Sequence, residues 1–196
     1  MVNPLNVAEY FIVRAYEDEE DTGMTNLKLQ KLLYYAQSLH LALLDEPLFE
    51  ERMQAWRNGP VCPSAYHYYS NYEANQLPIP LGKAFSKIPD ESREVLEEVW
   101  NNFKHHSAER LSAMSHSESP WLLARGDLPR HAASQEPLDL DEMKRLGSAK
   151  LDEIEESHPD YEPTMERVLE QALVSAGQNT TVDDQDIRGW LESLLD

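Results

Sequence analysis

Apolar residues recur three or four positions apart over much of the chain, and this spacing is typical of α-helices that bury one face. The most regular stretch begins after Thr25, whose hydroxyl can cap a helix, and stops before Pro47, which cannot continue one. Its apolar face is wider than a single stripe, so we expect neighbours on more than one side. The predicted central helix buries Leu29, Leu32, Leu33, Ala36, Leu39, His40 and Leu43.

The same spacing predicts further helices before and after this central one. They begin at or next to Pro4, Ser64, Asp90, Ser107 and Ser119. Residues 48–57 have no clear helical period, so we expect a short extended pair there. The predicted fold class is therefore mainly α, a compact multi-helix domain with one small β element.

Beyond Gly126 the chain becomes richer in proline and acidic residues, which indicates a linker and then a second region. We therefore divide the chain into a domain at 1–126 and an acidic, partly helical extension at 127–196. Within the extension, the spacing predicts a weak helix at 139–147 and a more regular one at 163–177.

The last segment of the chain places apolar side chains at helical spacing on an acidic background. An isolated helix of this length is marginal, so its apolar face needs a surface to cover it. That surface is either the rest of this chain or a groove on a partner, and the sequence does not decide between the two. The candidate contact residues are Ile187, Trp190, Leu191 and Leu194.

The charge of the chain limits what it can bind. Its formal net charge is −19, with 6 basic against 18 acidic residues in 127–196 and 11 against 18 in 1–126. Nucleic-acid binding depends on lysine and arginine neutralising phosphates, so direct binding of DNA or RNA by this chain alone is disfavoured. The acidic surface serves solubility or is complementary to a basic partner.

Cysteine usage and hydropathy predict a cytoplasmic protein. The single cysteine, Cys62, cannot form an intramolecular disulfide and fits a reducing compartment. The chain has no apolar run near the roughly 18 residues of a membrane span, and its first residues do not resemble a signal peptide. We expect no association with a membrane.

The sequence lacks the usual patterns of catalytic and metal-binding sites. The seven histidines do not have zinc-site spacing, and the adjacent His105 and His106 would face different directions on a helix. Cys62 and His116 are isolated candidates for catalysis, and a structural role is favoured for both because the sequence places no base beside them. Phosphate-binding and hydrolase motifs are also missing. We therefore expect no metal, no cofactor and no enzymatic activity.

Two places are candidates for contact with a partner. The first is the loop that follows Trp56, where the polar residues Arg57 and Asn58 precede a Gly-Pro turn. The second is the aromatic-rich segment after Ser64, in which Tyr66 and Tyr69 are candidates for a binding surface. Tyrosine also suits the rim of a core, and that alternative is slightly favoured here.

Four blocks of sequence, in order, resemble the Panacea domain of the SocA-like antitoxins of bacteria and phages. They are NLKLQKLLYYAQ at 26–37, PLF at 47–49, AWRNGPVCP at 55–63, and a closing part with VW at 99–100, SAERL at 107–111 and SHSESPW at 115–121. The resemblance covers roughly residues 4 to 126. The family-motif residues, for which we expect structural roles, are Leu29, Gln30, Leu33, Trp56, Gly59, Pro60, His116 and Trp121.

This resemblance implies an antitoxin that binds and silences a cognate toxic enzyme. The toxin is unspecified, and an acidic antitoxin would suit one that acts on tRNA or nucleotides. Two mechanisms remain open: direct stoichiometric binding, which we favour, and an adaptor role in which the chain delivers its toxin to an ATP-dependent protease. A small hydrolase that uses Cys62 or His116 is a third, disfavoured possibility.

Overall fold

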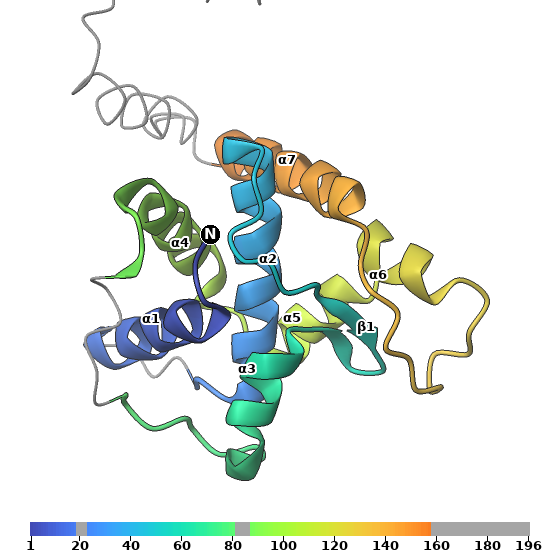
Figure 1. Cartoon of the computed structure of the whole chain (residues 1–196), viewed down its shortest axis with the longest axis horizontal. Helices are drawn as coiled ribbons and strands as arrows, with labels where there is room; N and C mark the ends of the chain where they lie inside the picture. The colour runs from blue at the N-terminus through green and yellow to red at the C-terminus, as the bar shows by residue number, and fades with distance from the viewer. Residues whose placement is uncertain (19–22, 81–86, 158–196) are drawn as a thin grey trace, which may run out of the picture. The chain divides into compact units, whose positions relative to one another are not determined.

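Helix α2 (Asn26–Leu44) forms the centre of the core, and the other elements pack around it (Figure 1). Residues 1–18, 23–80 and 87–157 are described by a computed structural model. The Thr25 hydroxyl accepts a hydrogen bond from the amide of Lys28, and the helix ends at Asp45, which adopts a positive φ of 56°. All the apolar-face residues predicted for this helix are buried, which confirms it as the centre of the core.

The described part of the chain is mainly helical, with one two-stranded antiparallel sheet, so the predicted fold class is confirmed. The extended pair expected at 48–57 is present but lies slightly later, with one strand on each side of the turn at 57–58. The remaining elements are α1 (Pro4–Glu17), β1 (Gln54–Trp56), β2 (Gly59–Val61), α3 (Pro63–Tyr68), the 3₁₀ turn η1 (Ser70–Tyr72), α4 (Asp90–Phe103), α5 (Ala108–Ser115), α6 (Ser119–Arg125) and α7 (Leu140–Ser157).

Helices α1 and α4 cover one side of α2 (Figure 1). Helix α1 begins at Asn3, whose side-chain oxygen accepts a hydrogen bond from the amide of Leu5 at 2.9 Å. The buried rings of Phe11 and Trp100 pack together across the two helices, with centroids 6.4 Å apart. The β-hairpin and helices α5 and α6 lie on the other side.

Helix α7 packs against the C-terminal half of α2 and belongs to the same core (Figure 1). It continues well beyond Gly147, where the sequence predicted its end. The chain leading to it also joins the domain, because the amide of Leu138 donates to the Met53 carbonyl and the amide of Ala55 donates to the Glu136 carbonyl, each at 2.8 Å. Its buried apolar side chains are Met143, Leu146, Leu151 and Ile154.

The boundary expected at residue 126 therefore falls inside a packed unit, which runs from Met1 to Tyr161. A second unit, Glu162–Asp196, lies outside the described residues. With it lie the helix expected at 163–177 and the candidate contact residues Ile187, Trp190, Leu191 and Leu194, which remain predictions. Among the described residues, no helix is both long enough and apolar enough to cross a membrane.

Candidate protein-binding surface

The tip of the β-hairpin presents Arg57 and Asn58 to solvent. Strands β1 and β2 pair so that Trp56 lies opposite Gly59, which leaves only these two residues in the turn. Gly59 has a φ of +99°, a conformation that L side chains rarely adopt. Both turn residues are exposed, as the sequence suggested for a contact site.

Side chains at the C-terminal end of α5 hold the backbone of this turn. The Nε2 atom of His116 lies 3.1 Å from the Arg57 carbonyl oxygen and must carry the proton, because a carbonyl can only accept. The Ser112 hydroxyl donates to the Asn58 carbonyl at 3.1 Å. The turn is therefore held by its main chain, which leaves both side chains free for a partner. This contact fits a structural role for His116, which stays a prediction.

Helix α6 holds the hairpin from the side. The indole nitrogen of Trp121 donates to the Trp56 carbonyl at 2.9 Å, and the Trp121 ring packs edge-on against His116 with centroids 4.4 Å apart. The buried guanidinium of Arg125 lies over the Trp121 ring, 4.8 Å from its centroid. Arg125 also donates to the carbonyls of Ala55, Pro129, Arg130 and Ala132. Sequence reasoning did not single out Arg125.

A buried lysine lies behind the second strand. Lys31 of α2 donates from Nζ to the Pro60 carbonyl at 2.9 Å, and its burial lowers its pKa to about 7. A Cβ atom on Gly59 would lie 2.6 Å from that nitrogen and 2.8 Å from the Ser115 hydroxyl. Gly59 is thus required both for its backbone angle and for this close approach.

Among the family-motif residues of α2, Gln30 also supports the hairpin region. The Gln30 side-chain oxygen accepts a hydrogen bond from the amide of Cys62 at 2.9 Å, and its amide group donates to Asn26 at 3.0 Å. Leu29 and Leu33 are fully buried. Gln30 therefore ties the end of the hairpin to α2, and Gln30, Leu29 and Leu33 are all buried.

Aromatic rings flank the hairpin tip. Trp56 packs against Tyr66 and His67 of α3, with ring centroids 4.8 and 5.9 Å apart. Tyr66 is half-buried and borders the tip, whereas Tyr69 is only 4 % exposed and points into the core. Tyr69 is therefore not placed to contact a partner, and its neighbours Tyr68 and Tyr72 are the exposed tyrosines of this segment.

The surroundings of His116 are cationic although the chain as a whole is acidic. Burial is the main cause that lowers the pKa of His116, and three cations, Lys31, Arg125 and Arg130, lower it further. With Arg57 at the tip, this face carries local positive charge on a chain of net charge −19.

Cys62 lies in a setting that disfavours nucleophilic chemistry. Its side chain is buried and donates to the Glu51 carboxylate at 3.2 Å. Burial, with Glu51 close by, raises the pKa of the thiol to about 12, so the reactive thiolate is not populated at neutral pH. Among the described residues, no three His, Cys, Asp or Glu side chains are grouped as a metal site would require.

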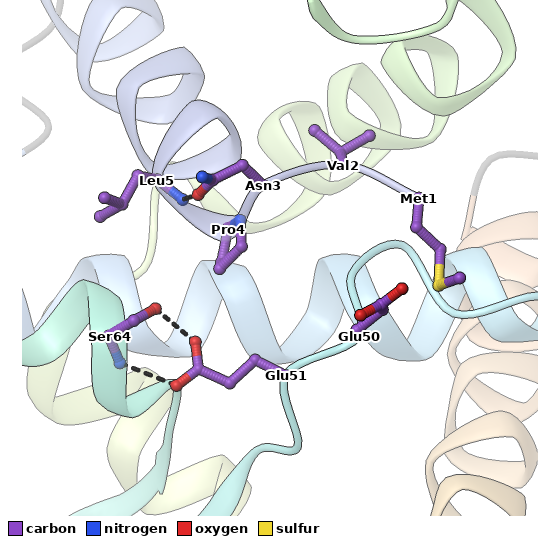
Figure 2. Close-up of a pocket in the computed structure, with 8 residues that line it drawn as sticks. All are labelled: Met1, Val2, Asn3, Pro4, Leu5, Glu50, Glu51 and Ser64. Atoms are coloured by element: carbon purple, nitrogen blue, oxygen red, sulfur yellow. Dashed lines mark hydrogen bonds between the residues drawn. The ribbon is translucent and has the colours of Figure 1, made fainter.

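A shallow cavity of about 610 Å³ lies beside the start of α1 (Figure 2). Figure 2 shows that the Glu51 carboxylate accepts hydrogen bonds from both the amide and the hydroxyl of Ser64, so it caps α3. The lining brings no histidine or lysine to Ser64 that could act as its base. The cavity has the character of a surface groove rather than an active site.

Comparison with known proteins identifies the central part of the chain. Residues 29–122 match the family model described as antitoxin SocA-like, Panacea domain. The chain is also 32 % identical over 121 residues to the protein "Antitoxin SocA" of Caulobacter vibrioides (strain NA1000 / CB15N). That similarity covers 54 % of this chain and 63 % of the relative's length. No solved structure matches the chain significantly.

The matched family is one of antitoxins and not of enzymes. The match begins inside α2 and ends inside α6, so it spans the central helix, the hairpin and both helices that hold the hairpin. Over residues 29–122 the chain is therefore similar to the Panacea domain of the SocA-like antitoxins.

Proposed function

We propose that this protein is a cytoplasmic antitoxin that binds a cognate toxic enzyme directly and silences it as a stoichiometric complex. The observation that carries the proposal is the SocA-like Panacea domain at residues 29–122. A partner toxin is what similarity to an antitoxin family implies, and the mode of neutralisation is our own inference.

The hairpin tip is the contact site that the geometry supports best. Arg57 and Asn58 project from a turn whose backbone is fixed by His116 and Ser112, so little ordering is needed on binding. Arginine flanked by tryptophan and tyrosine is also the composition that dominates the binding energy of protein interfaces. We infer that this tip contacts the toxin beside its active or substrate-binding face.

The net charge of −19 supports a basic partner. A toxin that acts on tRNA or nucleotides needs a positive surface for the phosphates, and an acidic antitoxin would be steered to that surface. Association of the two purified proteins should then slow markedly as salt is added. Association rates that do not change between low and physiological salt would remove this part of the proposal.

Co-expression with the product of the neighbouring gene tests the proposal. We expect this protein to rescue growth and to co-elute with that product in size exclusion, both in a normal host and in one that lacks its ATP-dependent proteases. Rescue only in the normal host, with disappearance of the toxin, would support the adaptor mechanism instead. A Leu33→Asp variant, which places a charge in the core, is the unfolded control.

A further inference from the structure

Three exposed tyrosines lie on α1, on the end of α3 and on η1, and α3 packs against both of the other elements. Tyr16, Tyr68 and Tyr72 are 43 %, 61 % and 39 % exposed, so each leaves part of its ring open to a partner. Tyr69 joins two of them, because its buried ring lies 4.9 Å from that of Tyr68 and 6.5 Å from that of Tyr72. We call Tyr16, Tyr68 and Tyr72 the tyrosine surface.

Local contacts hold this surface in place. The Tyr16 hydroxyl donates to the Leu77 carbonyl at 2.8 Å, which ties α1 to the segment after η1. Glu73, directly after Tyr72, adopts φ 51° and ψ −118°, a backbone conformation that residues other than glycine rarely adopt. Such strain persists only where the surroundings impose it, and it is concentrated at functional sites.

Two carboxylates, those of Glu9 and Glu73, accompany the rings. Glu9 lies two helical turns before Tyr16 on α1 and is close enough to Tyr69 that its charge adds to burial in raising the pKa of that phenol. Glu73 is exposed at the end of η1. Across residues 1–18, 23–80 and 87–157, neither carboxylate forms an ion pair with a lysine or arginine.

We infer that the tyrosine surface, with Glu9 and Glu73, binds lysine or arginine side chains presented by a partner protein. Electron-rich faces of tyrosine rings attract cations, and nearby carboxylates strengthen that attraction. A purely apolar partner would leave both carboxylates without a counter-charge, and a nucleic acid would be repelled by them. If the partner is the toxin, the inference rests on the proposed antitoxin function and names the part of the toxin that is recognised.

Peptide titrations of the full-length protein test this inference without knowledge of the toxin. The probe is a hexa-arginine peptide, and a hexa-citrulline peptide of the same shape without charge is its control. We expect the aromatic NMR signals of Tyr68 and Tyr72 to shift with hexa-arginine and not with hexa-citrulline. Unshifted signals of both rings at saturating hexa-arginine would overturn the inference, even where the peptide binds elsewhere on this acidic chain.

Two double variants distinguish the contribution of the aromatic ring faces from that of their apolar volume. Replacing Tyr68 and Tyr72 by leucine keeps an apolar surface but removes the aromatic faces, and we expect the affinity for hexa-arginine to fall about fivefold or more. Replacement of both by phenylalanine should keep the affinity within about twofold of the unaltered chain, since the ring faces remain. Equal affinity of the leucine and unaltered proteins would contradict a role for the rings.

Binding of the neighbouring gene product then separates this inference from the proposed function. If the unaltered chain binds that protein and the leucine variant binds it equally well, the tyrosine surface is not the contact, although the antitoxin function stands. If the unaltered chain does not bind it but hexa-arginine shifts both rings, the proposed function fails and the cation-binding surface stands.

Discussion

Gly147 of α7 lies so close to α2 that a Cβ atom on it would come within 2.0 Å of the Ser38 carbonyl oxygen and 2.9 Å of the Ala42 side chain. The two helices can cross at this distance only because residue 147 has no side chain. This contact explains why α7 belongs to the core of the domain although it follows the last residue of the family match.

Replacing Gly147 with alanine should destabilise the protein. In an exposed helix this change would stabilise by about 1 kcal/mol, because alanine is the better helix former. Here the new methyl group meets a backbone carbonyl, so we expect the free energy of unfolding to fall by about 1–3 kcal/mol. The measurement is chemical denaturation.

The matched control is Ala149→Gly, at an exposed position of the same helix. This change should lower the free energy of unfolding by no more than about 1 kcal/mol, because only helix propensity is affected. A Gly147→Ala protein more stable than the unaltered chain would mean that α7 does not cross α2 at this distance.

Shortening the chain tests whether α7 is part of the domain. A chain that ends at residue 126 exposes the face of α2 that α7 covers and loses the buried side chains of Leu138, Met143 and Leu146. Each such side chain contributes about 1.5–3 kcal/mol when buried, which is a large share of the stability of a small domain. We expect no cooperative thermal unfolding of this chain, whereas a chain that ends at residue 161 should unfold cooperatively. Equal melting temperatures for the two would contradict the assignment.

Lys31 should make stability depend on pH. Its pKa is lowered to about 7 in the folded protein, whereas an unfolded lysine titrates near 10.4. Between these values the unfolded state binds more protons, so the free energy of unfolding should rise as the pH is raised from 7 to 9. Cys62 opposes this trend from about pH 8.5, because the unfolded thiol ionises there while the buried thiol stays protonated, so the rise should be steepest between pH 7 and 8.

Denaturation at pH 7, 8 and 9 measures this dependence. A Lys31→Met variant keeps most of the buried volume and removes the titrating group, so its stability should change less with pH than that of the unaltered chain. Lys144→Met, which removes a partly exposed lysine paired with Asp45, is the control. Identical pH dependence in the Lys31→Met and unaltered proteins would show that Lys31 does not titrate in this range.

The hairpin tip should matter for binding but not for folding. Replacing both Arg57 and Asn58 with alanine leaves the backbone hydrogen bonds of the turn to His116 and Ser112 intact. We therefore expect an unchanged melting temperature and a loss of about tenfold or more in affinity for the toxin. Arg145→Ala, at an exposed site on α7, is the control and should bind normally. Normal binding by the double variant would place the interface elsewhere.

The sequence predicted the centre of the fold well, because the apolar face of α2 is long and regular and its start and end have clear signals. It predicted the wrong end for α7, since glycine after a helical pattern resembles a helix stop. The structure shows that Gly147 instead permits close packing on Ser38, a contact between residues about a hundred positions apart. Spacing along one helix cannot reveal such a contact.

The exposure of the candidate contact residues was predicted only in part, for a related reason. The exposed turn at Arg57 and Asn58 follows from local chemistry, and the structure places both in solvent. The six residues of α3 are too few to fix a helical face, so Tyr69 was selected where Tyr68 is the exposed ring. The role of Arg125 could not be predicted from the sequence. Its carbonyl partners lie in β1 and in the segment after α6, and only the fold brings these together.

Isothermal titration of the purified product of the neighbouring gene with this purified protein, in the absence of any protease, tests the central claim most directly. Direct neutralisation predicts saturable binding at a fixed molar ratio and a complex that remains intact in size exclusion. Absence of binding, under conditions where co-expression rescues growth, would contradict direct neutralisation and would leave delivery to a protease as the explanation of rescue.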